Sequence, residues 1–221
     1  MARTVPDDGV LVVGLGRFGS SLAEALVDLG FQVLGVDADA ANVQRNAELL
    51  THVVEADATD EEVMGQLGAG EFGRAVVGIG TDIEASILTT SVLAALGVPD
   101  IWAKAVTVAH GRILERVGAH HVVHPEHDMG RRVAHLVSGR MLEFVPLDEG
   151  FALVELKPPA QLVGRSLGEA QVRSRHGVTV VCIKPKGGSF TYATPETVPG
   201  PDDVLVVAGE TDRVEGFAKL D

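Results

Sequence analysis

Short apolar runs alternate with helical patterns along the first 138 residues, and this alternation limits the possible folds more than any other feature of the chain. The first run, residues 9–14, is apolar or glycine throughout, as expected of a strand covered on both faces of a parallel sheet. A helical pattern over residues 18–29 follows it and ends at Gly30. The alternation predicts an α/β fold, a Rossmann-like doubly wound parallel sheet with right-handed crossovers.

The same periodicities place the other elements of this region. Further strands are predicted at residues 31–36, 52–55, 74–79, 101–105 and 121–124. The helices between and after them are predicted at residues 40–50, 59–67, 84–96, 108–117 and 126–138.

The pattern changes after Gly139, where strands follow one another more closely. Strands are predicted at residues 143–146, 152–156, 178–184, 190–193 and 204–208, with helices only at 166–174 and 211–219. Turn signals such as Lys186-Gly187-Gly188 separate them. We therefore predict two domains, a nucleotide-binding domain over residues 1–138 and a small α+β module over residues 139–221.

A glycine motif stands between the first predicted strand and the first predicted helix. Gly14, Gly16 and Gly19 form G-x-G-x-x-G, in which the first glycine permits a tight turn, the second a close phosphate and the third close helix packing. The helix N-terminus offers free N–H groups and partial positive charge to that phosphate. Arg17 lies inside the loop, where its guanidinium can pair with further phosphate oxygens. This favours a ligand with a di- or triphosphate end.

An acidic residue ends the second predicted strand. Asp37 lies 18 residues after Gly19, close to the interval expected for the ribose-binding carboxylate of a dinucleotide fold. Such a carboxylate accepts hydrogen bonds from ribose hydroxyls and repels a 2′-phosphate. The sequence therefore predicts a site for NAD or an ATP-like ligand, in preference to NADP.

Further candidate residues follow later strands, because doubly wound folds bind ligands at the carboxyl ends of their strands. Asp57 and Ala58 follow the third strand and are placed beside the adenine ring. Gly80 and Thr81 follow the fourth strand, and Lys104 lies on the fifth. The lysine can balance phosphate charge or pair with a neighbouring acid, and the sequence leaves both open.

Histidines and acids cluster around the sixth predicted strand. His120, His121, His124, Glu126 and His127 are close in sequence, yet strand alternation sends His121 to the opposite face from His120 and His124. A tetrahedral zinc site needs converging ligands, so the spacing does not favour one. Glu126 alone is the candidate contact for a cation that bridges to bound phosphate.

Composition excludes several classes of function. The net charge of −13 opposes a phosphate backbone, so we expect no nucleic-acid partner. The single cysteine rules out a disulfide framework. The longest stretch without charged residues or histidine, residues 85–99, is too short to span a bilayer. Any action on a membrane is therefore expected to require a partner.

Taken together, the motifs resemble those of RCK domains, the regulators of conductance of potassium, and in particular the KtrA/TrkA-type cytosolic regulatory subunits of potassium uptake systems. The segments that carry this resemblance are residues 12–19, 36–39, 55–59, 78–80, 88–90, 101–105, 124–130, 163–167, 177–181 and 203–209. They span nearly the whole chain, and their order and spacing make the resemblance specific.

The resemblance implies a function. Such subunits form homodimers that assemble into an octameric ring beneath a membrane potassium-translocating subunit of the KtrB/TrkH type, and ATP and ADP favour different ring shapes. It implies a regulatory subunit that is not an enzyme, cytoplasmic and peripheral to the inner face of the membrane through its partner. The implied nucleotide contacts are Gly14, Gly16, Arg17, Phe18, Gly19, Asp37, Asp39, Asp57, Ala58, Gly80 and Lys104, with Glu126 as the contact of a divalent or monovalent cation.

Two points are left open by the sequence. Relatives bind cyclic di-AMP between two C-terminal modules, but here Gln171 stands in the corresponding region where relatives have asparagine. The glycine loop and Asp37 would equally suit an NAD(H)-binding redox sensor or an NAD-dependent dehydrogenase. A third possibility, besides a nucleotide-sensing regulator and an NAD(H)-binding protein, is a structural ring-forming domain whose pocket binds no nucleotide.

Overall fold

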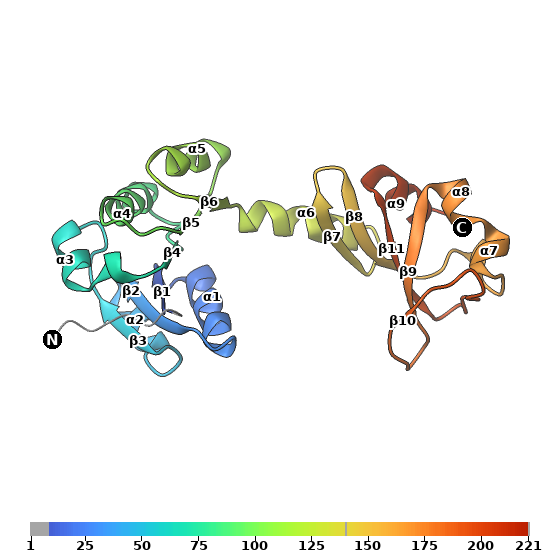
Figure 1. Ribbon diagram of the computed structural model, residues 1–221, viewed down its shortest axis with the longest axis horizontal. Coiled ribbons are helices and arrows are strands. Elements are labelled where there is room, and N and C mark those ends of the chain that lie inside the picture. Colours follow the sequence, from blue (N-terminus) through green and yellow to red (C-terminus); the bar gives the residue numbers. More distant parts are fainter. Residues whose placement is uncertain (1–8, 140, 221) are drawn as a thin grey trace. The chain divides into compact units, whose positions relative to one another are not determined.

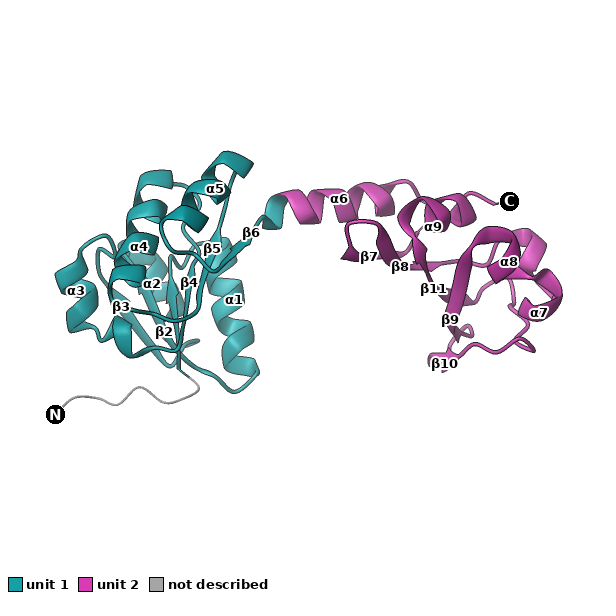
Figure 2. Ribbon diagram, turned by 45° about the horizontal axis from the view of Figure 1, so that its top comes forward, with its two compact units in different colours: residues 1–126 teal, residues 127–221 magenta. Residues whose placement is uncertain are grey.

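The computed structural model describes residues 9–139 and 141–220, which divide into two compact units, residues 1–126 and 127–221 (Figure 2). Each unit is built on its own sheet (Figure 1). The first sheet has six parallel strands in the order β3-β2-β1-β4-β5-β6, which is the order of a doubly wound dinucleotide-binding fold. The predicted fold class is confirmed.

The elements of the first sheet alternate regularly along the chain. Its strands are β1 (Gly9–Val13), β2 (Gln32–Asp37), β3 (His52–Glu55), β4 (Arg74–Val77), β5 (Ile101–Lys104) and β6 (His121–Val123). The helices are α1 (Arg17–Asp28), α2 (Ala40–Asn46), α3 (Glu61–Gln66), α4 (Ile83–Ala95), α5 (Val108–Arg116) and α6 (Pro125–Val137), with a 3-10 turn at Ala69–Glu71.

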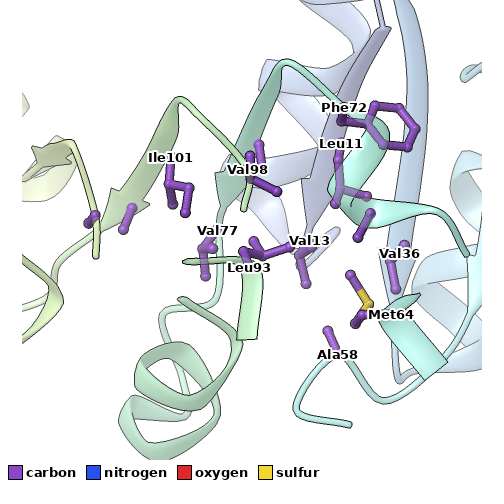
Figure 3. Packing of buried hydrophobic residues seen from close by; sticks show 14 of the residues in the cluster. Leu11, Val13, Val36, Ala58, Met64, Phe72, Val77, Leu93, Val98 and Ile101 are labelled. Carbon is purple, nitrogen blue, oxygen red and sulfur yellow. The ribbon is translucent and has the colours of Figure 1, made fainter. Parts of the chain in front are cut away.

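Both faces of this sheet are packed, as its continuous apolar strands predict. Along β1, Leu11 and Val13 face one cluster, which includes Met64 of α3 and Leu93 of α4 (Figure 3). Val10 and Val12 face a second cluster on the opposite side, where α1 packs. Because successive side chains of a strand point to opposite faces of the sheet, β1 contributes to both hydrophobic cores.

The α1 side of the sheet is covered only over part of its width. A row of register partners runs from Val12 through Val76 and Trp102 to His121 on this face. Val12 is fully buried, whereas the side chain of Trp102 is 38% exposed and stacks on His121, with ring centroids 4.1 Å apart. Asp100 accepts a hydrogen bond from the Trp102 indole. Within the first unit, the face of β5 and β6 thus presents an aromatic pair to solvent.

The second unit contains a five-stranded antiparallel sheet in the order β10-β9-β11-β8-β7. Its strands are β7 (Glu143–Asp148), β8 (Phe151–Leu156), β9 (Val178–Lys184), β10 (Thr191–Tyr192) and β11 (Val204–Glu210). Its helices are α7 (Leu167–Ala170), α8 (Val172–His176) and α9 (Thr211–Ala218), with a 3-10 turn at Ala160–Leu162. One core joins them, and Phe144, Leu205 and Phe217 lie at its centre.

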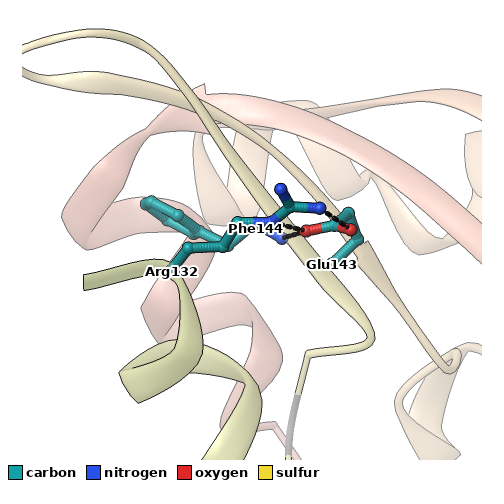
Figure 4. A network of polar contacts seen from close by, with 3 residues as sticks. All are labelled: Arg132, Glu143 and Phe144. Carbon is teal, nitrogen blue, oxygen red and sulfur yellow. Dashed lines mark hydrogen bonds and ion pairs between the residues drawn. The ribbon is translucent and has the colours of Figure 1, made fainter. Parts of the chain in front are cut away.

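Helix α6 is fixed to this second sheet by polar and ring contacts. The guanidinium of Arg132 donates two hydrogen bonds to the carboxylate of Glu143, which also accepts the amide of Phe144 (Figure 4). His135 stacks on the ring of Phe144 at 3.8 Å. These contacts assign residues 127–137 to the second unit, whereas the sequence prediction set the domain boundary after residue 138.

One predicted helix of the second unit is wrong. The pattern over residues 166–174 predicts a single helix, but the structure has α7 and α8 as two short helices broken at Gln171. Gln171 adopts a left-handed backbone with φ 50°, which no continuous helix can contain. The predicted helix over residues 40–50 also ends earlier, at Asn46.

The stretch without charged residues coincides largely with α4, a helix of only 13 residues. None of the helices in the described parts of the chain has the length and apolar character that a bilayer crossing demands.

A core substitution tests the two-sided packing of the first sheet. Leu11→Ala removes a fully buried side chain between β1 and the α3–α4 side, so we expect the free energy of unfolding to fall by about 2–5 kcal/mol. Urea unfolding followed by fluorescence of Trp102, the single tryptophan, reports on the first unit. Leu29→Ala is the matched control because Leu29 is 75% exposed, and an equal loss in both variants would contradict the packing described.

Candidate functional site

Two loops meet where the strand order of the first sheet reverses. β1 lies between β2 and β4, so the connections that leave β1 and β4 run to opposite sides of the sheet. Open α/β sheets bind ligands at this switch point, beyond the carboxyl ends of the strands. Here those ends carry the glycine loop, residues 14–19, and the loop at residues 78–82.

The glycine loop is packed so tightly that side chains are excluded at two of its three glycines. A Cβ at Gly19 would lie 1.8 Å from the carbonyl oxygen of Gly14. Gly14 itself has φ +88°, and a Cβ there would lie 2.8 Å from the side chain of Ile79. At Gly16, by contrast, a Cβ would meet no atom within 4 Å. The space beside Gly16 is therefore open to a ligand.

Helix α1 begins at this open position without a capping side chain. Its N-cap residue is Gly16, and its first turn contains no acid. The neighbouring helices α2, α3, α4 and α5 are each capped by an aspartate or a threonine side chain, as Asp39, Asp60, Asp82 and Thr107 show. The amides at the start of α1 are consequently available to an anion.

The carboxylate of Asp37 is tied into the glycine loop. Its Oδ2 accepts the amide of Leu15 at 2.5 Å and the side-chain amide of Asn42 at 3.1 Å. Its Oδ1 accepts the amide of Asp39 at 2.8 Å. Asp37 thus holds the end of β2 to the loop and keeps one oxygen with a single partner.

A cationic side chain lies beside the two loops. Lys104, at the end of β5, is 9% exposed and pairs with Glu126 at 2.6 Å between Nζ and Oε1. Its Nζ also lies 5.6 Å from the centroid of the Phe18 ring. The nearest atom to a Cβ at Gly80 would be this Nζ, at 3.0 Å. Lys104 therefore connects the glycine-loop helix, the loop after β4 and the first turn of α6.

The electrostatic state of Glu126 follows from these neighbours. The hydrogen bond from Lys104 lowers the pKa of the Glu126 carboxyl below its ordinary value, and the charge of Arg17 acts in the same direction. A lowered carboxyl pKa stabilises the folded state above the unfolded pKa, and this contribution is lost as the pH falls through the folded pKa. Arg17 is exposed and forms no ion pair with any described residue.

The other residues predicted to contact the nucleotide have different local environments. Asp39 caps α2 through the amide of Ala41. Asp57 accepts the amide and hydroxyl of Thr59, which lowers the pKa of the Asp57 carboxyl. Ala58 packs in the core, so its side chain is not available to a ligand. Thr81 is exposed just before α4.

No metal cluster is formed among residues 9–139 and 141–220, where no three His, Cys, Asp or Glu side chains gather as ligands. His120 instead accepts the amide of Ile101, and His121 stacks on Trp102. Glu126 offers one carboxylate, which Lys104 already engages. A cation at Glu126 would need its other ligands from outside these residues and stays a prediction.

Three contacts of the site were not foreseen from the sequence. They are the Leu15 amide on Asp37, the Asn42 side chain on Asp37, and the Phe18 ring beside Lys104. Of these, only the Asn42 contact could have been predicted from the sequence, because Asn42 lies five residues after Asp37 in the first turn of the following helix. The pairing of Lys104 with an acid, left open by the sequence, is the arrangement observed.

Comparison with known proteins places this chain in a family. Residues 10–125 match the TrkA-N domain, and residues 151–220 match the TrkA-C domain. The chain is 38% identical over 209 residues to the Ktr system potassium uptake protein C of Bacillus subtilis (strain 168), covering 94% of this chain and 95% of the relative. The chain belongs to the TrkA family of Ktr system proteins. The predicted resemblance to TrkA-type proteins of Ktr potassium uptake systems is confirmed.

Other members of the Ktr family and solved structures agree. The Ktr system potassium uptake protein A of Vibrio alginolyticus is 34% identical over 222 residues, covering 96% of this chain and 97% of the relative. The GsuK RCK domain has the same fold, with a TM-score of 0.66 at 21% identity. The match covers 98% of this chain and 49% of the GsuK chain, so this chain spans about half the length of that structure. The TrkA-N domain of the inner membrane protein ybaL from Escherichia coli gives a TM-score of 0.53 at 22% identity, covering 59% of this chain and 96% of that chain.

A substitution at the third glycine tests the geometry of the loop. Gly19→Ala would press a methyl group against the Gly14 carbonyl, so we expect a lower midpoint of thermal unfolding. Gly16→Ala is the matched control, because its methyl group meets open space, and its midpoint should fall only by the few degrees that a less favourable N-cap residue costs. A Gly19→Ala protein as stable as Gly16→Ala would contradict the close packing of α1.

Proposed function

We propose that this protein is a nucleotide-sensing regulatory subunit of a membrane potassium uptake system, and that the first sheet binds ATP or ADP. The observation that carries the proposal is the uncapped start of α1 at Gly16, with open space beside it and Arg17 and Lys104 nearby. Backbone amides and two cations suit a phosphate chain. The relatives are Ktr system potassium uptake proteins, which supports potassium uptake as the process regulated.

The nucleotide's sugar is assigned to Asp37. This carboxylate lies at the end of β2, and its Oδ1 has one hydrogen-bond partner. It would accept a ribose hydroxyl and repel a 2′-phosphate, which favours ATP, ADP or NAD(H) over NADP. The predicted contacts Asp57, Gly80 and Thr81 lie at the ends of neighbouring strands and complete the proposed site.

The ion pair of Lys104 supplies a route from the nucleotide to helix α6. A phosphate bound at the α1 N-terminus would attract Lys104 and compete with Glu126 for its ammonium group. Because Glu126 lies in the first turn of α6, loss of this pair changes how the helix is held. A nucleotide shifts the equilibrium between two conformations only if it binds one of them more tightly than the other. ATP and ADP therefore have opposite effects only if they favour different conformations.

We further propose that the protein acts as a homo-oligomer on a membrane potassium-translocating subunit, as dimers in an octameric ring. Helix α6 buries none of its residues and exposes Met129, Val133 and Val137 on one stripe. The aromatic pair of Trp102 and His121 leaves part of the first sheet uncovered as well. Both features suit contact with a second copy of this chain. Binding of cyclic di-AMP by the C-terminal module stays a prediction.

Catalysis is not part of the proposal. The relatives are named as uptake proteins, and the described site combines Asp37, Lys104 and Glu126 in structural or ion-pair contacts. An NAD(H)-responsive sensor would use the same loop and carboxylate, and the relative affinities for ATP, ADP and NADH distinguish it from an ATP/ADP sensor.

Titration calorimetry with ATP, ADP and NADH tests the site directly. We expect ATP and ADP to bind, and Gly16→Ala to weaken both by about tenfold or more, since a methyl group would separate phosphate from the loop amides. Tight binding of NADH alone would favour the redox-sensor alternative. No measurable affinity for any of the three at cytosol-like salt would overturn the proposal.

Arg17 is proposed as the residue that distinguishes ATP from ADP. It is exposed beside the phosphate loop, where a terminal phosphate would meet its guanidinium. We expect Arg17→Ala to retain ADP binding and to lower ATP affinity about tenfold, the worth of one charge-assisted hydrogen bond. Arg112→Ala, which removes an exposed arginine of α5, is the charge-matched control. An unchanged ratio of ATP to ADP affinity would refute this role.

A further inference from the structure

We infer that Asn42 is a positioning residue for the nucleotide's sugar, acting through Asp37 to present a single carboxylate oxygen to the ribose. This inference rests on the proposed nucleotide site and goes beyond it, because Asn42 itself need not touch the ligand. It follows from the hydrogen bonds that surround the Asp37 carboxylate.

The two oxygens of Asp37 are not equivalent. Oδ2 is engaged twice, by the Leu15 amide at 2.5 Å and by Nδ2 of Asn42 at 3.1 Å. Oδ1 accepts only the Asp39 amide, at 2.8 Å. A carboxylate oxygen has two lone-pair directions, so Oδ2 is saturated and Oδ1 keeps one free. The ribose hydroxyl is therefore assigned to Oδ1.

The orientation of the Asn42 amide is fixed from its other end. Its Oδ1 accepts a hydrogen bond from the guanidinium of Arg45, which can only donate. Nδ2 must therefore face Asp37, where a carboxylate can only accept. The backbone carbonyl of Asn42 accepts the side chain of the buried Asn46 at 2.8 Å. Arg45, Asn42 and Asp37 thus form one directed chain of hydrogen bonds from α2 to the end of β2.

Two consequences follow for ligand selection. Without Nδ2, only Leu15 holds Oδ2, so the carboxylate is freer to rotate away from the ribose. Arg45 would also lose its partner on α2, and a free arginine near this position can accommodate a 2′-phosphate. Asn42 therefore supports both recognition of the ribose hydroxyl and rejection of a 2′-phosphorylated ligand.

The test compares ADP with 2′-deoxy-ADP by titration calorimetry. Asn42→Leu keeps the side-chain size but removes both hydrogen bonds, and Gln44→Leu is the matched control on the exposed side of α2. We expect the wild-type protein and Gln44→Leu to prefer ADP over 2′-deoxy-ADP. In Asn42→Leu that preference should shrink by about tenfold, because a well-placed hydrogen bond to a charged group is lost.

The outcomes separate this inference from the proposed function. If the wild-type protein binds neither ADP nor its deoxy form, the proposed function fails. If it binds ADP and Asn42→Leu keeps the wild-type preference, the positioning role is refuted, whatever happens to overall affinity. Should Asn42→Leu unfold, Asn42→Asp keeps the side-chain shape and the Arg45 contact but replaces the donor that faces Asp37 with an acceptor; a reduced preference there supports the role, and an unchanged one refutes it.

Discussion

The contact between Gly19 and the carbonyl of Gly14 is the constraint on which the first unit of this molecule depends. It lets α1 begin so close to the sheet that no side chain fits between them. Gly78 approaches from β4 in the same way, since a Cβ there would lie 2.9 Å from the same carbonyl oxygen. These three glycines bring the ends of β1 and β4 together and direct the first amides of α1 toward solvent. The charges of the site are arranged around that opening.

Lys104 is the group that gives this opening a connection to the rest of the chain. A nearly buried ammonium needs an anion, and Glu126 meets that need in the first turn of α6. In the proposed function, a phosphate at α1 would offer a second anion to the same lysine. One cation with two alternative partners can thus relate ligand binding to the helix that leads into the second unit.

Sequence reasoning predicted the elements that depend on local pattern. The strand at His52–Glu55 and the doubly wound order follow from apolar runs and from crossover handedness, and the glycine motif follows from its place between a strand and a helix. The break at Gln171 was missed, because a left-handed glutamine has no signature in helical periodicity. The Asn42 and Leu15 contacts with Asp37 were missed because they depend on how α2 and the loop fold over the end of β2. The core position of Ala58 likewise depends on tertiary packing.

In the proposed function, bound phosphate and Glu126 share Lys104, and the pKa of Glu126 measures this sharing directly. Carboxyl NMR titration of the protein without nucleotide should give a Glu126 pKa below the ordinary glutamate value, because Lys104 stabilises the charged form. With saturating ADP the pKa should rise, since the lysine turns to the phosphates and their negative charge lies nearby. A Glu126 pKa that stays low and unchanged when ADP is bound would contradict the account.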